Sequence, residues 1–237
     1  MRNILAIYTK ELKTYFNAPM AYIFLVIFAV VNGYFFTNTF FLFNQSNMRA
    51  LFNIIPLVYL FFIPAVTMSL IAREKNVGTI EIVHTMPIKD GEFITGKFLA
   101  AFTLILVGLG TTLLHLITLM NVGMNIDYGA VLTGYLGLAM VGAVYTSVGT
   151  FSSSITDNQV VAFIIGLFIV LVFFLMDKML IFVPASMAGI IQYLSVDYHF
   201  SNISRGVIDS RNLIYFASVI GFFLLMTARM LEIRKWR

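Results

Sequence analysis

Six long apolar segments, separated by shorter polar ones, run through most of the 237-residue chain. Each approaches the roughly 17–25 residues that a helix needs to cross about 30 Å of hydrocarbon. A transmembrane β-barrel would instead show segments of about 10 residues with alternating polarity, and the sequence lacks that pattern. We therefore predict an all-α membrane protein with one transmembrane domain over residues 1–237. The predicted spans are Met20–Phe41, Leu51–Ala72, Phe98–Met120, Gly129–Phe151, Gln159–Leu175 and Leu213–Ala228.

Residues 1–19, ahead of the first span, follow a different pattern. Their apolar side chains repeat with helical spacing, and the two lysines fall elsewhere. The apolar face consists of Ile4, Leu5, Tyr8, Leu12 and Tyr15. This spacing predicts an amphipathic helix on the membrane surface. The alternative is an ordinary polar end of the first span; a signal peptide would place its apolar run earlier.

The link between spans five and six, residues 176–212, is too long for a turn. It contains Pro184 and an amphipathic stretch, SMAGIIQYLSV, before a polar run. We expect one or two short helices there. They would either cap the bundle or form an outer gate or docking surface, and the sequence leaves both open.

The distribution of basic residues predicts the orientation of the spans. Charged residues make up only 11% of the chain, and the mean hydropathy is +0.93. With six spans both termini lie on one side, and eleven of the 15 Lys and Arg residues fall on that side. Because basic residues accumulate on the cytoplasmic side, both termini and the polar segment 73–97 are predicted to be cytoplasmic.

The segment Arg73–Lys97, REKNVGTIEIVHTMPIKDGEFITGK, holds eight of the 26 charged residues. Gly78 is expected to end one helix, Thr79 to begin another, and Pro87 to stop it. The charges alone are compatible with a solvated loop that fixes topology. The apolar residues among them indicate a surface that docks a partner.

Residues for catalysis or metal binding are scarce. The chain has no Cys, and its three His residues lack the spacing of a zinc helix. His115 is the one ionisable side chain well inside a predicted span; it is either a hydrogen-bonded packing residue or part of a pathway. Without Asp, Glu, Lys or Arg inside the spans, proton-coupled transport and intramembrane proteolysis are disfavoured. We therefore expect no catalytic residues, no metal site and no nucleic-acid partner.

One stretch, Gly91–Phe98, reads GEFITGKF and matches the phosphate-binding loop G-x-x-x-x-G-K-[ST] except at its last position. The Ser or Thr of that motif binds Mg²⁺ through its hydroxyl, and Phe98 has none. The motif also requires a buried strand before the loop, which the sequence does not predict. We therefore expect no nucleotide site in this chain.

Small residues recur along one side of the fourth span, and such rows let helices approach closely in lipid. This packing lies either within one subunit or between two. The candidate packing residues are Ala139, Gly142, Ala143, Thr146 and Ser147.

The segment REKNVGTIEIVHTMPIKDGEFITGKFLAA resembles the first cytoplasmic loop of type-2 ABC exporter permeases, which joins spans two and three. YTKELKTYFNAPMAYIF resembles the surface helix that leads into span one of these proteins. GTFSSSITDNQVVAF resembles the turn between spans four and five, and YHFSNISRGVIDSRNLIYF the external segment before span six. The similarity covers nearly the whole chain and is strongest to the gliding-motility-type permeases, with nitrous-oxide-reductase maturation permeases as relatives.

The resemblance implies a permease subunit of the bacterial inner membrane that couples ATP hydrolysis to export or to conformational work. A separate cytoplasmic ATPase would bind ATP and Mg²⁺, and a second permease, identical or different, would complete the complex. The segment Gly78–Thr85 would be the coupling helix, which sits in a groove of the ATPase. The implied coupling residues are Arg73, Glu74, Gly78, Thr79, Ile80, Glu81, Val83 and Pro87. The external candidates, which would face an extracytoplasmic accessory protein, are His199, Arg205, Gly206 and Asp209.

Two other classes of function stay open. The chain could act alone as a channel or secondary transporter, although the absence of charge inside the spans weakens this reading. It could also be a membrane anchor that recruits a cytoplasmic partner without transporting anything. The transported substrate is not specified by the sequence.

Overall fold

The computed structural model describes residues 2–42, 48–81, 87–123 and 126–235, and within these ranges the secondary structure is helical, without strands. Among the described residues, six helical segments are long and apolar enough to cross a membrane, which confirms the predicted all-α architecture. They are Pro19–Phe40, Arg49–Val77, Asp90–Val122, Tyr128–Ile155, Gln159–Met176 and Ser210–Ile233.

The spans are built from α-helices with shorter helical elements between them. These elements are α1 (Arg2–Asn17), α2 (Pro19–Thr37), the π-helix η1 (Asn38–Leu42), α3 (Arg49–Thr67), α4 (Ala72–Val77), α6 (Asp90–Thr111), α7 (Leu113–Val122), α8 (Tyr128–Ile155), α9 (Gln159–Met176), the 3-10 helix η2 (Lys178–Phe182), α10 (Ala185–Leu194), α11 (Val196–Ser204) and α12 (Ser210–Lys235).

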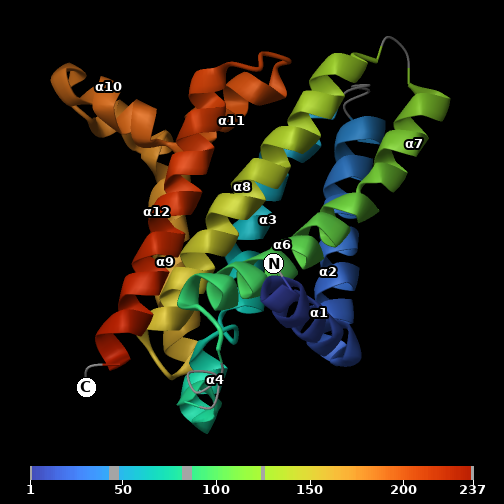
Figure 1. Cartoon of the computed structure of the whole chain (residues 1–237). Coiled ribbons are helices and arrows are strands. Elements are labelled where there is room, and N and C mark those ends of the chain that lie inside the picture. Colours follow the sequence, from blue (N-terminus) through green and yellow to red (C-terminus); the bar gives the residue numbers. More distant parts are fainter. Residues whose placement is uncertain (1, 43–47, 82–86, 124–125, 236–237) are drawn as a thin grey trace.

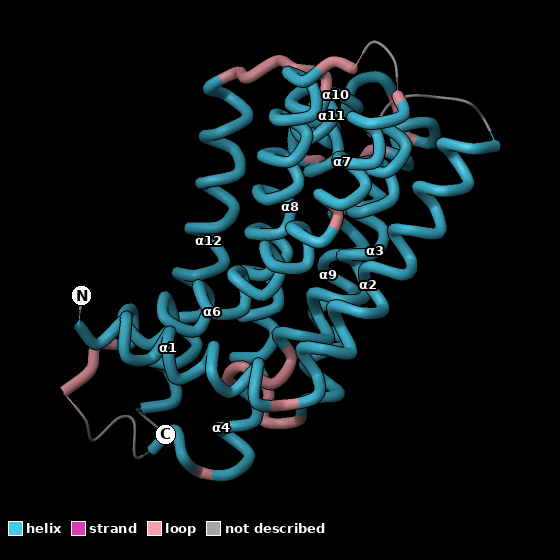
Figure 2. Tube along the Cα trace, turned by 90° about the vertical axis from the view of Figure 1, so that its right-hand side faces the viewer, coloured by secondary structure: helices cyan, strands magenta, loops and turns pink. Residues whose placement is uncertain are grey.

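The spans run side by side, and α1 runs crosswise to them (Figures 1 and 2). Both termini and α4 lie toward one end of the bundle, whereas α10 and α11 lie at the other. We call the first the α1–α4 end and the second the α10–α11 end. The position of both termini toward the same end is what an even number of spans requires.

Helix α8 is the central element, since it packs against α3, α6, α9, α11 and α12. Glycines permit this packing at two points: a Cβ on Gly134 would lie 2.1 Å from Phe52, and one on Gly149 would lie 1.9 Å from the Oγ1 atom of Thr67. Backbones in a lipid-embedded bundle approach most closely where side chains are smallest. The contact of α3 with α8 therefore depends on the absence of side chains at these positions.

The small residues predicted to mediate helix packing lie on this central helix. Gly142, Ala143, Thr146 and Ser147 are buried, and Ala139 is half-buried. A Cβ on Gly142 would meet Ile105 of α6 at 3.2 Å. These residues are thus covered by neighbouring helices of the same chain, without a second subunit.

Two features of the third span differ from the sequence expectation. Its helix begins at Asp90, well before the apolar run at Phe98, and Glu92 accepts a hydrogen bond from the backbone N–H of Lys89 at 3.2 Å. The span is also divided at Thr112, whose hydroxyl donates to the carbonyl of Leu109 at 2.6 Å and lies 3.1 Å from the Tyr135 hydroxyl. The apolar pattern of the sequence predicts neither the polar first turn of α6 nor the hydrogen bond of Thr112 at the break between α6 and α7.

His115 follows this break in α7. Its ring stacks on Phe36 with the centroids 4.8 Å apart, and a Cβ on Gly33 would lie 3.5 Å from its Cε1 atom. The residue thus packs against α2. This contact is consistent with the packing interpretation of an isolated histidine in a span.

The segment between spans five and six forms three helical elements, η2, α10 and α11, rather than one or two. Helix α11 packs on α8, α9 and α12, whereas α10 extends from the bundle (Figure 1). His199 of α11 is 1% exposed, and its Nδ1 and Nε2 atoms lie 2.7 Å from Asn212 Oδ1 and 2.9 Å from the Tyr193 carbonyl. Its ring stacks on Tyr215 at 3.9 Å. His199 therefore holds α11 against α12 and the end of α10.

The other three external candidates form the turn between α11 and α12. Gly206 has a φ of 93°, a conformation that L side chains rarely adopt. The carboxylate of Asp209 accepts a hydrogen bond from the N–H of Arg211 at 2.9 Å, which satisfies a donor at the start of α12. Arg205 is exposed. Two of the three thus have a structural role in reversing the chain.

Gly149→Ala is expected to lower stability by about 1–3 kcal/mol, because the added methyl group overlaps Thr67 in a packed interface. Gly221→Ala in α12 is the control, since a Cβ there meets nothing within 4 Å. The measurement is the thermal unfolding midpoint in detergent. Equal midpoints for the two variants would show that the close contact of α3 with α8 is not required.

Candidate functional site

The polar segment that begins at Arg73 is fixed at its start by the end of α8. Helix α3 ends at Thr67, and after a turn α4 begins at Ala72. The Ser153 hydroxyl accepts hydrogen bonds from the N–H groups of Ile71 and Ala72, both at 3.0 Å, and donates to the Met68 carbonyl at 2.8 Å. These bonds satisfy backbone groups where the helix is interrupted. A side chain of the fourth span thereby sets the direction in which α4 leaves the bundle.

Gly78 ends α4, as the sequence predicted. Its φ is 77°, and its N–H donates to the Lys75 carbonyl at 3.2 Å. Thr79 begins the next helical stretch, and its hydroxyl donates to the Glu74 carbonyl at 3.4 Å. Helical structure continues to Glu81, which is exposed. Gly78 therefore separates α4 from a second, short helical stretch.

The remaining coupling candidates are distributed unevenly. Ile80 is 1% exposed and belongs to the core, whereas Pro87 is exposed just before α6. Val83 lies outside the described residues, as does the second half of the predicted coupling helix. Arg73, Glu74 and Thr79 line one pocket beside α4. The structure thus brings three of the predicted residues together.

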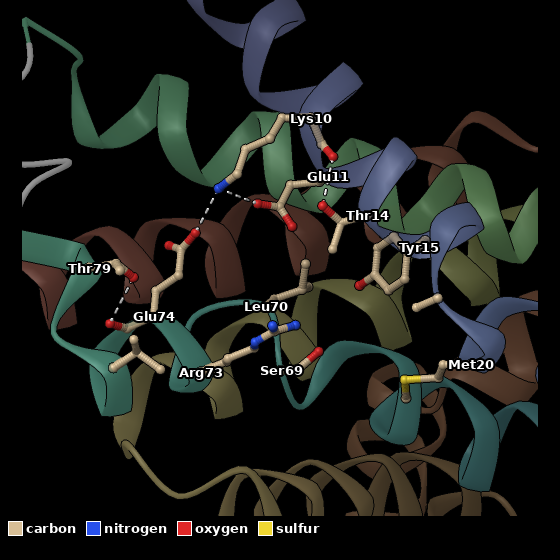
Figure 3. A pocket seen from close by; sticks show the side chains of 12 residues that line it. Lys10, Glu11, Thr14, Tyr15, Met20, Ser69, Leu70, Arg73, Glu74 and Thr79 are labelled. Atoms are coloured by element: carbon tan, nitrogen blue, oxygen red, sulfur yellow. Dashed lines mark hydrogen bonds and ion pairs between the residues drawn. The ribbon is translucent and has the colours of Figure 1, made fainter.

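Four charged side chains form a cluster at this point. Lys97 of α6 is 1% exposed, and its Nζ atom lies 2.9 Å from Glu11 Oε1 and 3.0 Å from Glu74 Oε1. Lys10 Nζ lies 3.3 Å and 3.2 Å from the same two oxygens. Figure 3 shows Lys10 between the two carboxylates. We call these residues the ionic cluster; it joins α1, α4 and α6.

Burial makes the ionic cluster sensitive to the loss of one member. A buried ion pair contributes little net stability, but removing one partner leaves an uncompensated charge and costs about 3–5 kcal/mol. Burial lowers the pKa of Lys10, but attraction to Glu11 and Glu74 outweighs this effect, and its pKa is raised above the ordinary value. Lys10 is therefore positively charged at neutral pH. The Lys97 ammonium also lies 5.0 Å from the centroid of the Phe93 ring.

Close packing places α1 within reach of the other members. A Cβ on Gly96 would lie 2.9 Å from Ile7, so α1 and α6 touch directly. At one end of this contact, Asn3 donates to Glu92 at 3.0 Å. At the other, the Tyr15 hydroxyl donates to the Val66 carbonyl of α3 at 3.1 Å, and burial raises the pKa of Tyr15.

The face that α1 packs against the protein differs in part from the predicted apolar face. Leu5 is 65% exposed, whereas the charged Glu11 is only 8% exposed. Glu11 lies one helical turn from both Tyr8 and Tyr15, so the sequence places it on the same face as these apolar residues. Apolar periodicity assigns no role to an acid at such a position. Lys10, Glu11, Lys97 and Ser153 were all missed as site residues, because their partners lie far away in the sequence.

A pocket of about 480 Å³ lies beside the ionic cluster, between α1, the start of α2 and α4 (Figure 3). It is lined by Lys10, Glu11, Thr14, Tyr15, Ala18, Met20, Ser69, Leu70, Arg73, Glu74, Val77 and Thr79. No three His, Asp or Glu side chains come together as a metal site in the described part of the chain. The arrangement is suited to contacts with a partner or ligand.

Lys97→Met is expected to lower the free energy of unfolding by about 3–5 kcal/mol, because two buried carboxylates would keep only Lys10 as a counter-charge. Lys178→Met is the matched control: its ion pair with Asp197 has the same 3.0 Å length but lies at the surface. The control should change stability by less than about 1 kcal/mol. Chemical denaturation in detergent measures both; similar losses would contradict the role of burial.

Comparison with protein-family models supports one assignment. The model described as ABC-2 family transporter protein matches residues 5–228, which include all of the ionic cluster and parts of all six spans. A comparison with curated proteins finds no match. The match extends over far more than half of the chain and agrees with the six apolar helices. The chain belongs to the ABC-2 transporter family and is a multi-pass membrane protein.

Proposed function

We propose that the chain is the transmembrane permease subunit of an ATP-binding cassette transporter, coupling ATP hydrolysis by a separate ATPase to export or to conformational work. The observation that carries this proposal is the ionic cluster, which ties the projecting segment after α3 to α1 and α6. Membership of the ABC-2 family supports a partner ATPase and a second permease subunit. ATP and Mg²⁺ would be bound by the ATPase.

The proposed contact with the ATPase is the stretch from α4 through the coupling helix. Helix α4 lies at the extreme lower end of the bundle in both views (Figures 1 and 2). Val77 is 66% exposed there, and Glu81 is exposed as well. An apolar side chain beside a charged one on a projecting element fits a groove in another protein.

Movement of this contact would reach several spans at once. Helix α4 continues from α3 through the turn that Ser153 of α8 holds. Glu74 connects it through Lys97 to α6 and through Lys10 to α1. A push on α4 is therefore expected to displace α1, α3, α6 and α8 together, which is the mechanical requirement for reorienting a bundle.

We propose that the α1–α4 end faces the cytoplasm, because most basic residues lie near it. For the second permease we propose the outer face of α9, where Val160, Ile164 and Phe168 are 64%, 58% and 63% exposed. The resemblance to type-2 ABC exporter permeases also implies that spans two and five line the interface between the two permeases, and α9 is span five. We further propose that the chain is a permease of the gliding-motility type, which is the subfamily that its sequence resembles most.

Glu81→Arg is expected to reduce ATP-dependent activity of the reconstituted complex about tenfold or more, because it reverses a charge in the proposed contact. Gly78→Pro should have a similar effect, because proline cannot adopt the φ of 77° at this turn. Glu232→Arg, the same charge reversal at an exposed acid of α12, is the control and should retain activity.

The measurements are recovery of the ATPase in a native pull-down and its activity in liposomes. Normal coupling in both variants would remove this segment from the proposed mechanism. Recovery of the wild-type chain without any ATP-binding protein would favour a channel, a secondary transporter or a membrane anchor instead.

A further inference from the structure

The pocket beside the ionic cluster is lined by one buried acceptor without a partner and, next to it in the chain, by one exposed cation. Oε1 of Glu74 contacts both lysines, but its Oε2 atom is buried and has no hydrogen-bond partner among the described residues. The side chain of Arg73, the preceding residue, lines the same pocket and is exposed, with no hydrogen bond or ion pair to another described residue. An orphaned buried acceptor is costly, so a donor from outside the chain would be stabilising here.

The remaining walls combine hydroxyl groups with an apolar surface. Thr14 and Ser69 supply the hydroxyls, and Tyr15, Met20 and Leu70 supply apolar area. Met20 lies in the first turn of α2, and Leu70 follows the end of α3. The pocket therefore lies where two spans meet the surface of the bilayer, at the level of lipid headgroups.

These features specify a ligand. Arg73 requires an anionic group, and a guanidinium matches the oxygens of a phosphate in geometry. Glu74 Oε2 requires an N–H donor, which a primary ammonium provides. Both residues line the same pocket, so a single ligand that carries both groups can contact the two side chains. The apolar walls require a hydrocarbon portion next to them.

We propose that this pocket binds the headgroup of one phosphatidylethanolamine molecule, with its phosphate at Arg73 and its ammonium at Glu74 Oε2. Phosphatidylcholine has the same charges, but its trimethylammonium has no N–H to donate. Phosphatidylglycerol has the phosphate but no cation. The site thus distinguishes these phospholipids by hydrogen bonding as well as by charge. Lipid binding here does not depend on the identity or presence of the ATPase.

The test is native mass spectrometry of the purified full-length chain, titrated separately with phosphatidylethanolamine, phosphatidylcholine and phosphatidylglycerol. We expect a single high-affinity adduct with phosphatidylethanolamine only. Arg73→Gln should weaken this adduct about tenfold or more, through loss of a charge-assisted contact. Arg49→Gln, an exposed arginine at the start of α3, is the matched control and should bind as the wild type does.

Glu74→Gln provides a second readout that total binding does not. It replaces a charged carboxylate, which only accepts hydrogen bonds, with a neutral amide. The preference for phosphatidylethanolamine over phosphatidylcholine should therefore fall even though the phosphate contact persists. Because Glu74 also belongs to the ionic cluster, this variant is compared only after its thermal midpoint has been measured. Arg73, which lies outside the cluster, keeps the test independent of folding.

Three results would overturn the proposal. The first is equal binding of the three lipids, and the second is unchanged binding by Arg73→Gln. The third is displacement of the lipid by free phosphoethanolamine at comparable concentration, which would assign the pocket to a soluble ligand. If lipid preference is absent and Arg73→Gln instead weakens recovery of the ATPase, the two groups serve a protein contact.

Discussion

A buried ammonium group, that of Lys97, is the interaction on which this structure depends most. It lies almost completely out of water and is neutralised by carboxylates from two other elements, Glu11 of α1 and Glu74 of α4. Because a buried charge cannot be left without its partners, α1, α4 and α6 cannot separate without a large cost in free energy. These ion pairs hold the projecting helix α4 against α6 and α1. Ser153 adds a second attachment, from the centre of the fold.

The same constraint connects the proposed function with the proposed lipid site. In this account the ATPase acts on α4, and the ionic cluster distributes the movement to helices that cross the membrane. The pocket beside the cluster lies between α1 and α4 and includes the unused oxygen of Glu74. A bound phosphatidylethanolamine would therefore contact Glu74 of the ionic cluster, the same residue that is proposed to pass the movement of α4 to the spans.

Sequence patterns predicted the number of membrane-spanning helical segments because a bilayer imposes a simple rule on length and apolarity. They also predicted the end of α4 at Gly78, since a positive φ is a local property of glycine. The ionic cluster was not predictable in this way. Glu11 and Lys97 are 86 residues apart in the sequence, and only the crosswise path of α1 brings them together. Likewise, the burial of His199 follows from how α11 packs, which periodicity does not specify.

If the ionic cluster transmits movement from the ATPase, α1 and α4 move as one body, and the distance between them tests this directly. The chain has no Cys, so spin labels can be attached at introduced cysteines on the exposed residues Leu5 and Asn76 of one subunit. Pulsed electron resonance of the assembled complex then gives this distance with and without ATP. We expect this distance to stay unchanged within a subunit while α4 moves relative to the second permease. A change with ATP in the distance between Leu5 and Asn76 would contradict it.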